Sequence, residues 1–366
     1  MRAGHPRARR LCGSPRAPEK PTAAAVSVAA VQVLEAFDRL QVEELLARGE
    51  RFWLRLHAPR EEVLQEVGDL LGLDHLAIED SMQFGQRPKI DDYPDSALLV
   101  FYGARTSGTA SHAKTIIVPT EFHFHVTGTA IVSVRRHNAD PTPQDVRRRV
   151  ALQDIDTAEE VLYRVLDALV STWNPALQSI DDEVDRLEDE ILENADTGQR
   201  LRLLEIKHSL VAVRQTVSSQ RDVLAGRREI LETLPGFSDR EGRESLRDIF
   251  DRVSLVSQQV DNVRESVSNA LDLYVSAVAN ELNQIIKVLT IVATFFLPLT
   301  FVTGFFGQNF GWLVRHVASP EAFALLGLGI NAVIVIGLWT WFTRAGYIDI
   351  REFLGRRRTP RPPRAP

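Results

Sequence analysis

The sequence contains a single cysteine, Cys12, among its 366 residues. One cysteine excludes an internal disulfide framework and the cysteine-rich motifs of structural zinc sites. The chain also lacks the Gly-x-x-x-x-Gly-Lys-Ser/Thr loop that cradles phosphates in ATPases, and no pairing of a nucleophile with a base stands out. We therefore expect a protein that is not an enzyme and that holds no cofactor.

A strong charge of one sign is absent as well. The net charge is -6 and the pI is about 5.9, which gives no general indication of nucleic-acid binding. The mean hydropathy of -0.11 is typical of a soluble protein, but it averages two unlike parts. Charged residues fill the first three quarters of the chain, and the last quarter carries two long apolar runs.

The apolar runs cover residues 288–306 and 322–342, and neither contains a charged residue. Each is close to the roughly 20 residues that an α-helix needs to cross the hydrocarbon core of a bilayer. We predict two transmembrane helices joined by an extracytoplasmic loop at residues 307–321. Buried core helices of a soluble protein are the alternative, which the length of the runs and their lack of charge disfavour.

Basic residues beside these runs predict their orientation. Lys287 precedes the first run, Arg344 and Arg351 follow the second, and the loop between them holds only Arg315. Lys and Arg are enriched on the cytoplasmic side of transmembrane helices. Both termini, including a basic tail at residues 343–366, are therefore expected in the cytoplasm of a multi-pass protein of the plasma membrane.

The first part of the chain divides into a tail and a mixed domain. Residues 1–25 are rich in Arg and Pro, which predicts a disordered tail, with a signal peptide as the weaker alternative. Residues 26–150 predict a compact α/β domain with a helix that starts at Pro59. Its strands are expected at residues 52–56, 97–102, 116–118, 122–126 and 130–134, with a turn at Thr127-Gly128.

His123 and His125 alternate along one of these predicted strands and therefore share a face. A zinc site there lacks other close ligands. We expect the two histidines to lie at the surface of the strand.

Residues 151–240 predict an antiparallel helical hairpin. Apolar side chains repeat at alternating spacings of four and three residues through Ile180, Val184, Leu187 and Ile191. Residues 195–198 interrupt the pattern, so we expect the turn there. Pro235-Gly236 and Gly242 are expected to end this unit.

Residues 243–306 predict a long stalk helix that continues into the first membrane span. No Gly or Pro occurs between Gly242 and Pro298, which leaves about 54 residues of helix pattern, roughly 80 Å at 1.5 Å per residue. The apolar repeat resumes along this helix, which therefore needs partners to bury its seam. A single two-helix hairpin cannot enclose a pore, so transport would need an oligomer.

Polar residues mark the first span. The hydroxyls of Thr290, Thr294, Thr300 and Thr303 are weak indicators, because such groups often bond to their own helix backbone. Asn283 and Asn309, at either end of the span, carry more weight, since an amide in lipid needs a partner or water.

Several of these segments, in order, resemble the CorA-type magnesium and divalent cation transporters. The stretch from Lys287 to Asn309 is similar to the family's pore helix and ends in Gly307-Gln308-Asn309, where the family has Gly-Met-Asn. Further resemblances cover nearly everything after residue 45 and include Ile78-Glu79-Asp80, Arg87-Pro88-Lys89-Ile90-Asp91-Asp92-Tyr93, Ile180-Asp181-Asp182-Glu183-Val184, Leu271-Asp272-Leu273-Tyr274 and Ser319-Pro320-Glu321.

The resemblance implies a fold and a set of site residues. The fold is an α+β cytoplasmic domain plus a long stalk helix and two C-terminal transmembrane helices, assembled as a homopentameric funnel in the bilayer. Gly307, Gln308 and Asn309 would form the selectivity filter. The pore would be lined by Asn283, Ile286, Leu289, Ala293, Leu297, Thr300 and Gly304, with a hydrophobic gate at Ile286, Leu289 and Leu297.

The physical chemistry of Mg²⁺ suits this assignment. Mg²⁺ dehydrates reluctantly, and a ring of neutral amides binds the hydrated ion without stripping its water. Two charges crossing about 100 mV gain roughly 4.6 kcal/mol, so the membrane potential suffices to drive uptake. By resemblance, Asp80 and Asp272 lie near cytoplasmic sites where Mg²⁺ would bridge carboxylates and hold the pore shut. The acidic run at residues 181–193 is interpreted as a solvated helix face.

Departures from the family pattern leave the ion open. Gln308 replaces the central Met, and His316 in the loop would favour Zn²⁺, Co²⁺ or Ni²⁺ over Mg²⁺ if it bound the ion; a solvated side chain is the alternative. Mg²⁺ is the expected substrate. Proton-coupled Zn²⁺ transport on the same scaffold is the first alternative, and a non-conducting membrane sensor or scaffold is the second.

Overall fold

The structure is a computed structural model that describes residues 31–107, 116–136, 157–233, 240–308, 311–316 and 319–347. It divides into two compact units, which are treated separately below. One unit contains Met1–Asp185 and Arg202–Ser268, and the other contains Arg186–Leu201 and Asn269–Pro366. The predicted N-terminal tail, Asn309, and the basic tail beyond Tyr347 lie outside the described residues.

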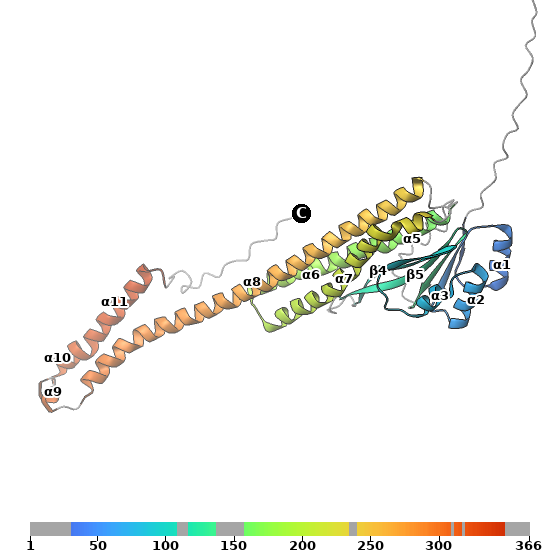
Figure 1. Cartoon of the computed structure of the whole chain (residues 1–366). Coiled ribbons are helices and arrows are strands. Elements are labelled where there is room, and N and C mark those ends of the chain that lie inside the picture. The colour runs from blue at the N-terminus through green and yellow to red at the C-terminus, as the bar shows by residue number, and fades with distance from the viewer. Residues whose placement is uncertain are drawn as a thin grey trace, which may run out of the picture. The chain divides into compact units, whose positions relative to one another are not determined.

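The first unit is built on a six-stranded mixed sheet (Figure 1). Its strand order is β1-β2-β6-β5-β4-β3, where β1–β2 and β2–β6 pair in parallel and the remaining neighbours pair antiparallel. The strands are β1 (Gln32–Leu34), β2 (Phe52–His57), β3 (Lys89–Tyr93), β4 (Ser96–Ser107), β5 (Ile116–Thr127) and β6 (Ala130–Arg135). The separate strands expected at residues 116–118 and 122–126 form one continuous strand, β5, because β4 pairs with it along its whole length.

Three short helices pack on one face of the sheet: α1 (Arg39–Arg48), α2 (Glu61–Leu71) and α3 (His75–Met82). The core beneath them joins apolar residues of the helices, such as Leu45, Leu64 and Ile78, to residues of β2 and β6. Asp38 begins α1 by accepting hydrogen bonds from two backbone N–H groups, and Gly49 ends it at φ 64°, a conformation that favours glycine.

The other face carries α5 (Ala158–Ser171), which continues after Thr172 into α6 (Trp173–Glu193). Because Gly103 has no side chain, α5 approaches β4 so closely that a Cβ atom there would lie 3.1 Å from Leu169. β3 pairs with β4 only as far as Val100, so side chains satisfy the exposed edge beyond it. Ala104 N donates to the Thr172 hydroxyl at 2.7 Å, and Tyr102 N donates to Gln220 Oε1 at 2.8 Å.

The helical hairpin consists of α6 and α7 (Thr197–Thr233), and the interruption at residues 195–198 coincides with the gap between them. Asp196 Oδ1 accepts from the backbone N–H groups of Gly198 and Gln199, which fixes the start of α7. The apolar repeat is confirmed as a core, since Ile180, Val184, Leu187 and Ile191 are all buried.

Helix α8 (Arg240–Phe306) runs for 67 residues and contains Pro298. The expectation that Gly242 ends the preceding unit is wrong: Gly242 lies in the first turn of α8, where one glycine costs only about 1 kcal/mol. The apolar seam is buried as far as Ala270, and no residue of α8 beyond that point is buried within the chain. The described residues therefore leave the second half of the seam without a buried contact.

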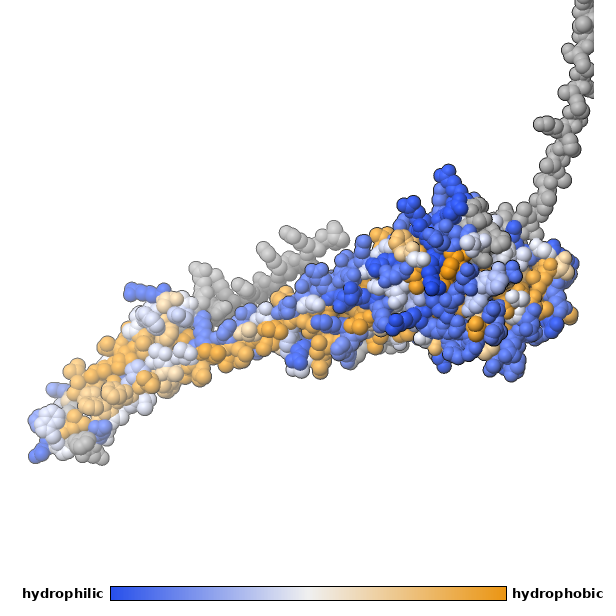
Figure 2. Space-filling view, viewed as in Figure 1, coloured by the Kyte–Doolittle hydropathy of each residue, from blue (hydrophilic) through white to orange (hydrophobic). Residues whose placement is uncertain are grey.

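After α8 come α9 (Gly311–His316), α10 (Pro320–Ala322), the π-helix η1 (Phe323–Gly329) and α11 (Ile330–Arg344). Two helical segments, Arg240–Phe306 and Pro320–Arg344, are long and apolar enough to cross a membrane. Figure 2 shows apolar residues covering the surface of the C-terminal part of α8 and of α11. The two spans pack together at Phe295 and Phe342, whose ring centroids lie 5.6 Å apart. The predicted fold class is thus confirmed at the level of the single chain.

Candidate ion pathway and regulatory cluster

The residues predicted to line a pore share one face of α8. Their spacings of three and four residues place them along a single helical stripe. Every one of them is exposed in the single chain, and none is charged: Asn283, Ile286, Leu289, Ala293, Leu297, Thr300 and Gly304. Leu297 is 75% exposed and Leu289 is 66% exposed. The stripe is therefore a neutral and mainly apolar surface that the other described residues leave exposed.

The hydroxyl groups of this span bond to their own helix. Thr290 donates to the Ile286 carbonyl at 2.7 Å, and Thr300 donates to the Phe296 carbonyl at 2.8 Å. Thr294 and Thr303 likewise each donate to the backbone carbonyl four residues earlier. These threonines carry little information about an ion path, as the sequence indicated.

The predicted filter begins where α8 ends. Gly307 N donates to the Thr303 carbonyl at 2.9 Å, and Gln308 N donates to the Phe305 carbonyl at 3.3 Å. A Cβ atom on Gly307 would lie 2.9 Å from the Thr303 oxygen, so the helix end closes tightly only with glycine. Gly307 and Gln308 are exposed, and Asn309, the third filter residue, lies outside the described residues.

His316 in the connecting loop is held in one orientation. Its ring stacks on Trp312 with centroids 4.6 Å apart, and its Nδ1 lies 2.9 Å from the Trp312 carbonyl oxygen. A carbonyl only accepts, so Nδ1 carries the proton of the neutral ring. Nε2 is therefore the unprotonated nitrogen, the arrangement in which an imidazole binds a metal ion.

Asn331 in the second span was missed by sequence reasoning. Its Nδ2 donates to the carbonyl of Gly327 in η1 at 2.5 Å, and its Oδ1 is buried without a hydrogen-bond partner among the described residues. The signal was available, because Asn331 is an amide within an otherwise apolar run.

The two predicted regulatory aspartates fall in different units. Asp80 lies near the C-terminal end of α3, and Asp272 is exposed on α8. A site that joins them between subunits stays a prediction.

Asp80 already has a cation beside it. Lys89 Nζ on β3 lies 2.5 Å from Asp80 Oδ2 and 2.7 Å from Asp91 Oδ2. Burial lowers the pKa of Lys89, but the hydrogen bonds to Asp80 and Asp91 outweigh it and raise the pKa above its ordinary value. The ammonium group is therefore charged at neutral pH.

Glu121 on β5 fixes the loop between Asp80 and Lys89. Its carboxylate accepts from Gly85 N at 2.5 Å and from Gln86 N at 3.1 Å. The Gln86 side chain donates in turn to the Asp80 carbonyl at 2.6 Å, and the Tyr102 hydroxyl donates to the Gln86 carbonyl. Three hydrogen bonds thus tie this loop to the sheet, and a fourth ties the Asp80 backbone to Gln86 of the loop.

The expectation that His123 and His125 lie at the strand surface is wrong. They share a face, as predicted, but they are 0% and 1% exposed, because α3 covers that face. Ser81 Oγ lies 2.8 Å from His125 Nε2 and 3.1 Å from His123 Nδ1. The polar side chains satisfy one another, which removes the main cost of burying them.

The charge of Glu121 sets the direction of this chain of hydrogen bonds. An ionised carboxylate only accepts, so His123 Nε2 donates to Glu121 Oε1 across 2.8 Å. When the His123 ring is neutral, its Nδ1 accepts from the Ser81 hydroxyl, and Ser81 accepts from His125 Nε2. Each donor meets an acceptor, with no site left for a metal ion between the histidines.

Burial and hydrogen bonding together set the charge states of this network. Burial, with a smaller contribution from His123, lowers the pKa of His125 to about 3, so its ring is neutral. For Glu121, burial raises the pKa, but hydrogen bonds from His123, Gly85 and Gln86 outweigh it and lower the pKa below its ordinary value. Glu121 is therefore ionised at neutral pH.

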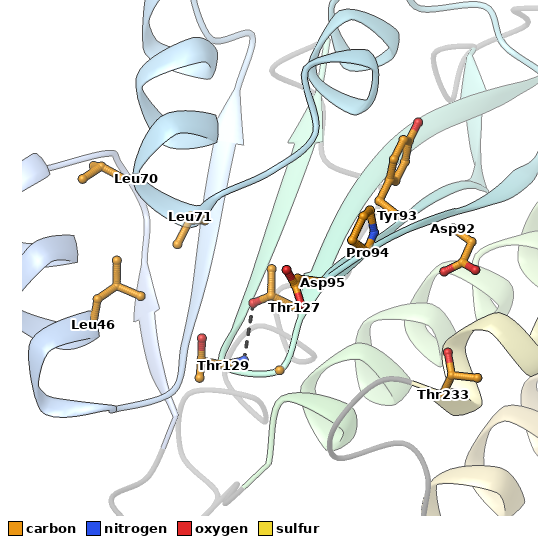
Figure 3. Close-up of a pocket in the computed structure, with 11 residues that line it drawn as sticks. Leu46, Leu70, Leu71, Asp92, Tyr93, Pro94, Asp95, Thr127, Thr129 and Thr233 are labelled. Atoms are coloured by element: carbon orange, nitrogen blue, oxygen red, sulfur yellow. Dashed lines mark hydrogen bonds between the residues drawn. The ribbon is translucent and has the colours of Figure 1, made fainter.

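Other candidate sites carry no comparable chemistry. A cavity of about 810 Å³ is lined by Asp92, Asp95 and Thr127, with Leu46, Leu70 and Leu71 opposite (Figure 3). Within the described part of the chain, no group of three His, Cys, Asp or Glu residues could hold a metal ion. In the acidic run of α6, Glu183 pairs with Arg202, and the remaining acids are exposed or half-buried.

Known proteins share this architecture. The cobalt/magnesium transport protein CorA of Thermotoga maritima is 31% identical over 287 residues, which cover 76% of this chain and 78% of that protein. The zinc transport protein ZntB of Photorhabdus laumondii is 26% identical over 255 residues, or 69% of this chain and 73% of that protein. The solved CorA magnesium transporter from Methanocaldococcus jannaschii matches with a TM-score of 0.66 at 20% identity over 81% of this chain and 91% of that one, which shows a shared fold.

A sheet domain, a 67-residue helix that is apolar enough to cross a membrane and a second candidate span give the architecture of a membrane protein with a stalk helix. Residues 49–344 match the family described as CorA-like Mg²⁺ transporter protein, and the chain belongs to that family. It is a transporter of divalent metal cations and not an enzyme, as the sequence predicted.

Proposed function

We propose that the protein is a homopentameric channel through which the membrane potential drives Mg²⁺ into the cytoplasm. One observation carries this proposal: the exposed neutral stripe of α8, which the other described residues leave uncovered. In a ring of five copies the stripe would face a central pore, and the remaining apolar seam would pack between neighbours. Both termini would lie in the cytoplasm, where Lys287 and Arg344 flank the spans.

The filter proposed for this pore is the ring of Gly307, Gln308 and Asn309. Neutral amides hydrogen-bond the water shell of Mg²⁺, which the ion gives up reluctantly. Below the filter, Leu297, Leu289 and Ile286 present apolar side chains that would interrupt a water column when the ring narrows. Selection by amides and gating by apolar side chains would then lie along one helix.

Regulation by cytoplasmic Mg²⁺ is part of the proposal. Mg²⁺ bound at Asp80 of one subunit and Asp272 of another would hold the pore shut, and loss of the ion would let the carboxylates repel. The hydrogen bonds that fix the backbone around Asp80 support a defined position for this ligand.

Zinc transport coupled to protons is the second candidate. It is favoured by His316, whose Nε2 is the unprotonated nitrogen, and by Gln308 in place of the family's Met. One of the relatives is named a zinc transport protein. Co²⁺ and Ni²⁺ would be further substrates of the same path. A non-conducting sensor or scaffold remains as the outcome in which no ion moves.

Uptake into liposomes that contain the purified full-length protein separates these functions. Mg²⁺, Zn²⁺, Co²⁺ and Ni²⁺ are offered one at a time, with and without a membrane potential and with and without a pH gradient. Mg²⁺ uptake that follows the potential and ignores the pH gradient is expected. Zn²⁺ uptake that requires the pH gradient would replace the proposal by the zinc transporter, and uptake of no ion would favour the sensor.

A further inference from the structure

Lys89 lies between two carboxylates, and this placement has a consequence for the regulatory site. Its Nζ is 2.5 Å from Asp80 Oδ2 and 2.7 Å from Asp91 Oδ2. Lys89 and Asp91 alternate on β3 and therefore share a face of the strand. The ammonium group thus already binds a carboxylate oxygen of Asp80 to which a divalent cation would also bind.

We propose that Lys89 is a tethered competitor of the regulatory divalent cation: it neutralises Asp80 when the site is empty and moves to Asp91 when the ion binds. This inference rests on the proposed regulatory role of Asp80. On this inference, Lys89 sets the cytoplasmic concentration of the ion at which the pore closes.

The surroundings allow the lysine to move while Asp80 stays in place. The Lys89 side chain is 28% exposed and those of Asp80 and Asp91 are 35% and 30% exposed, so water reaches all three. Lysine is a flexible point charge with three donors, and it exchanges partners without a fixed geometry. The backbone of Asp80, in contrast, is held by Gln86 and, through the loop, by Glu121.

Asp91 is suited to receive the lysine. Among the described residues, Arg227 of α7 also contacts Asp91: the Arg227 guanidinium lies 3.9 Å from Asp91 Oδ1 and donates to the Ile90 carbonyl at 3.1 Å. Arg227 therefore contacts the other carboxylate oxygen and leaves Oδ2 to Lys89. Movement of Lys89 toward Asp91 would strengthen an existing contact and needs no new partner.

Two substitutions should act in opposite directions. Lys89→Gln removes the competitor, so the Mg²⁺ concentration that gives half-maximal protection from proteolysis should fall by about three- to tenfold. Asp91→Asn removes the alternative partner and holds Lys89 on Asp80, so that concentration should rise by about two- to threefold. General damage to the fold would not give opposite signs.

The measurement is protection of the full-length protein from limited chymotrypsin digestion as Mg²⁺ is added. Chymotrypsin is used because Lys89→Gln removes a tryptic site. The matched control is Arg87→Gln, which removes the same charge from an exposed residue of the same loop that makes no hydrogen bond or ion pair with Asp80 among the described residues. The control should shift the midpoint by less than about twofold.

Asp80→Asn separates the inference from the function on which it rests. Suppose that Asp80→Asn raises the midpoint, while Lys89→Gln and Asp91→Asn either leave the midpoint unchanged or both shift it in the same direction. The competitor role proposed for Lys89 is then wrong, and Asp80 keeps its regulatory role. If Asp80→Asn has no effect, both ideas fail. The account expects Lys89→Gln to have no further effect when Asp80→Asn is already present.

Discussion

At the scale of single residues, His125 is a histidine that the fold keeps uncharged. Burial lowers its pKa from 6.5 to about 3. In the unfolded chain the ring takes up a proton as the pH falls below about 6.5, and in the folded chain it does so only near pH 3. The unfolded state therefore binds more protons between these values, and stability is lost as the pH falls through this window.

The first prediction follows from this difference. In His125→Gln, the side-chain Nε2 can still donate to Ser81, but the group no longer titrates. Acidification from pH 7.5 to 5 should then cost the variant about 2 kcal/mol less stability than it costs the parent protein. Thermal unfolding of the full-length protein across this pH range measures the difference. His75→Gln, at a side chain that is 85% exposed, is the control and should retain the parent's acid sensitivity.

His316 leads to a second prediction at this scale. Its Nε2 is unprotonated because Nδ1 donates to Trp312, so it would favour late transition metals over Mg²⁺. His316→Gln should lower Zn²⁺, Co²⁺ and Ni²⁺ uptake by about two- to fivefold and leave Mg²⁺ uptake unchanged. If the variant takes up each of the four ions as fast as the parent protein does, the side chain is merely solvated.

The residue-level contacts mark how far the sequence could be interpreted. His123 and His125 alternate with apolar residues, which correctly places them on one face of a strand. The rule that a polar face meets water then fails, because α3 covers this face and brings Ser81 as the polar partner. Likewise, Asp80 and Lys89 belong to recognisable segments, but their contact depends on how α3 packs beside β3.

At the scale of elements, the α6–α7 hairpin depends on an ion pair as well as on its apolar seam. Arg202 Nε and a second guanidinium nitrogen contact the two oxygens of Glu183 at 2.7 and 2.8 Å. Both side chains are only about a tenth exposed, at 10% and 11%. Removal of such a bidentate partner from a buried carboxylate costs several times more folding stability than removal of one partner of a surface ion pair.

Arg202→Met should therefore destabilise the hairpin by about 3 kcal/mol. The double variant Arg202→Met, Glu183→Leu should recover most of this loss, because no charge is then left buried. Faster hydrogen exchange in α6 and α7 of the single variant, reversed in the double variant, is the expected result. Parent-like exchange in the single variant would mean that the pair contributes nothing.

Helix periodicity was the most informative sequence signal for the elements. The heptad residues of α6 and of the first half of α8 are buried as the repeat predicted. Periodicity does not name the partner, however: the seam is buried up to Ala270 and is only half-buried or exposed beyond it. The π-helix η1 was not predictable, because its residues form an ordinary apolar run and its hydrogen bond with Asn331 appears only in three dimensions.

At the scale of the whole molecule, the single chain is incomplete as a transporter. Its first span exposes a neutral stripe and its second span buries an amide oxygen without a described partner. Several copies are needed to turn the stripe into the wall of a pore. The sequence and its family define this architecture, while the filter, the gate and the number of subunits are proposals about the assembled protein.

Mg²⁺ uptake into liposomes by Asn309→Ala, compared with Asn331→Ala, tests the proposed pore most directly. Both variants remove one amide per chain, but only Asn309 belongs to the proposed filter. With the oligomer intact in both, we expect voltage-driven Mg²⁺ uptake to be lost in Asn309→Ala and retained in Asn331→Ala. Undiminished uptake by Asn309→Ala would contradict the assignment of the ion path to the end of α8.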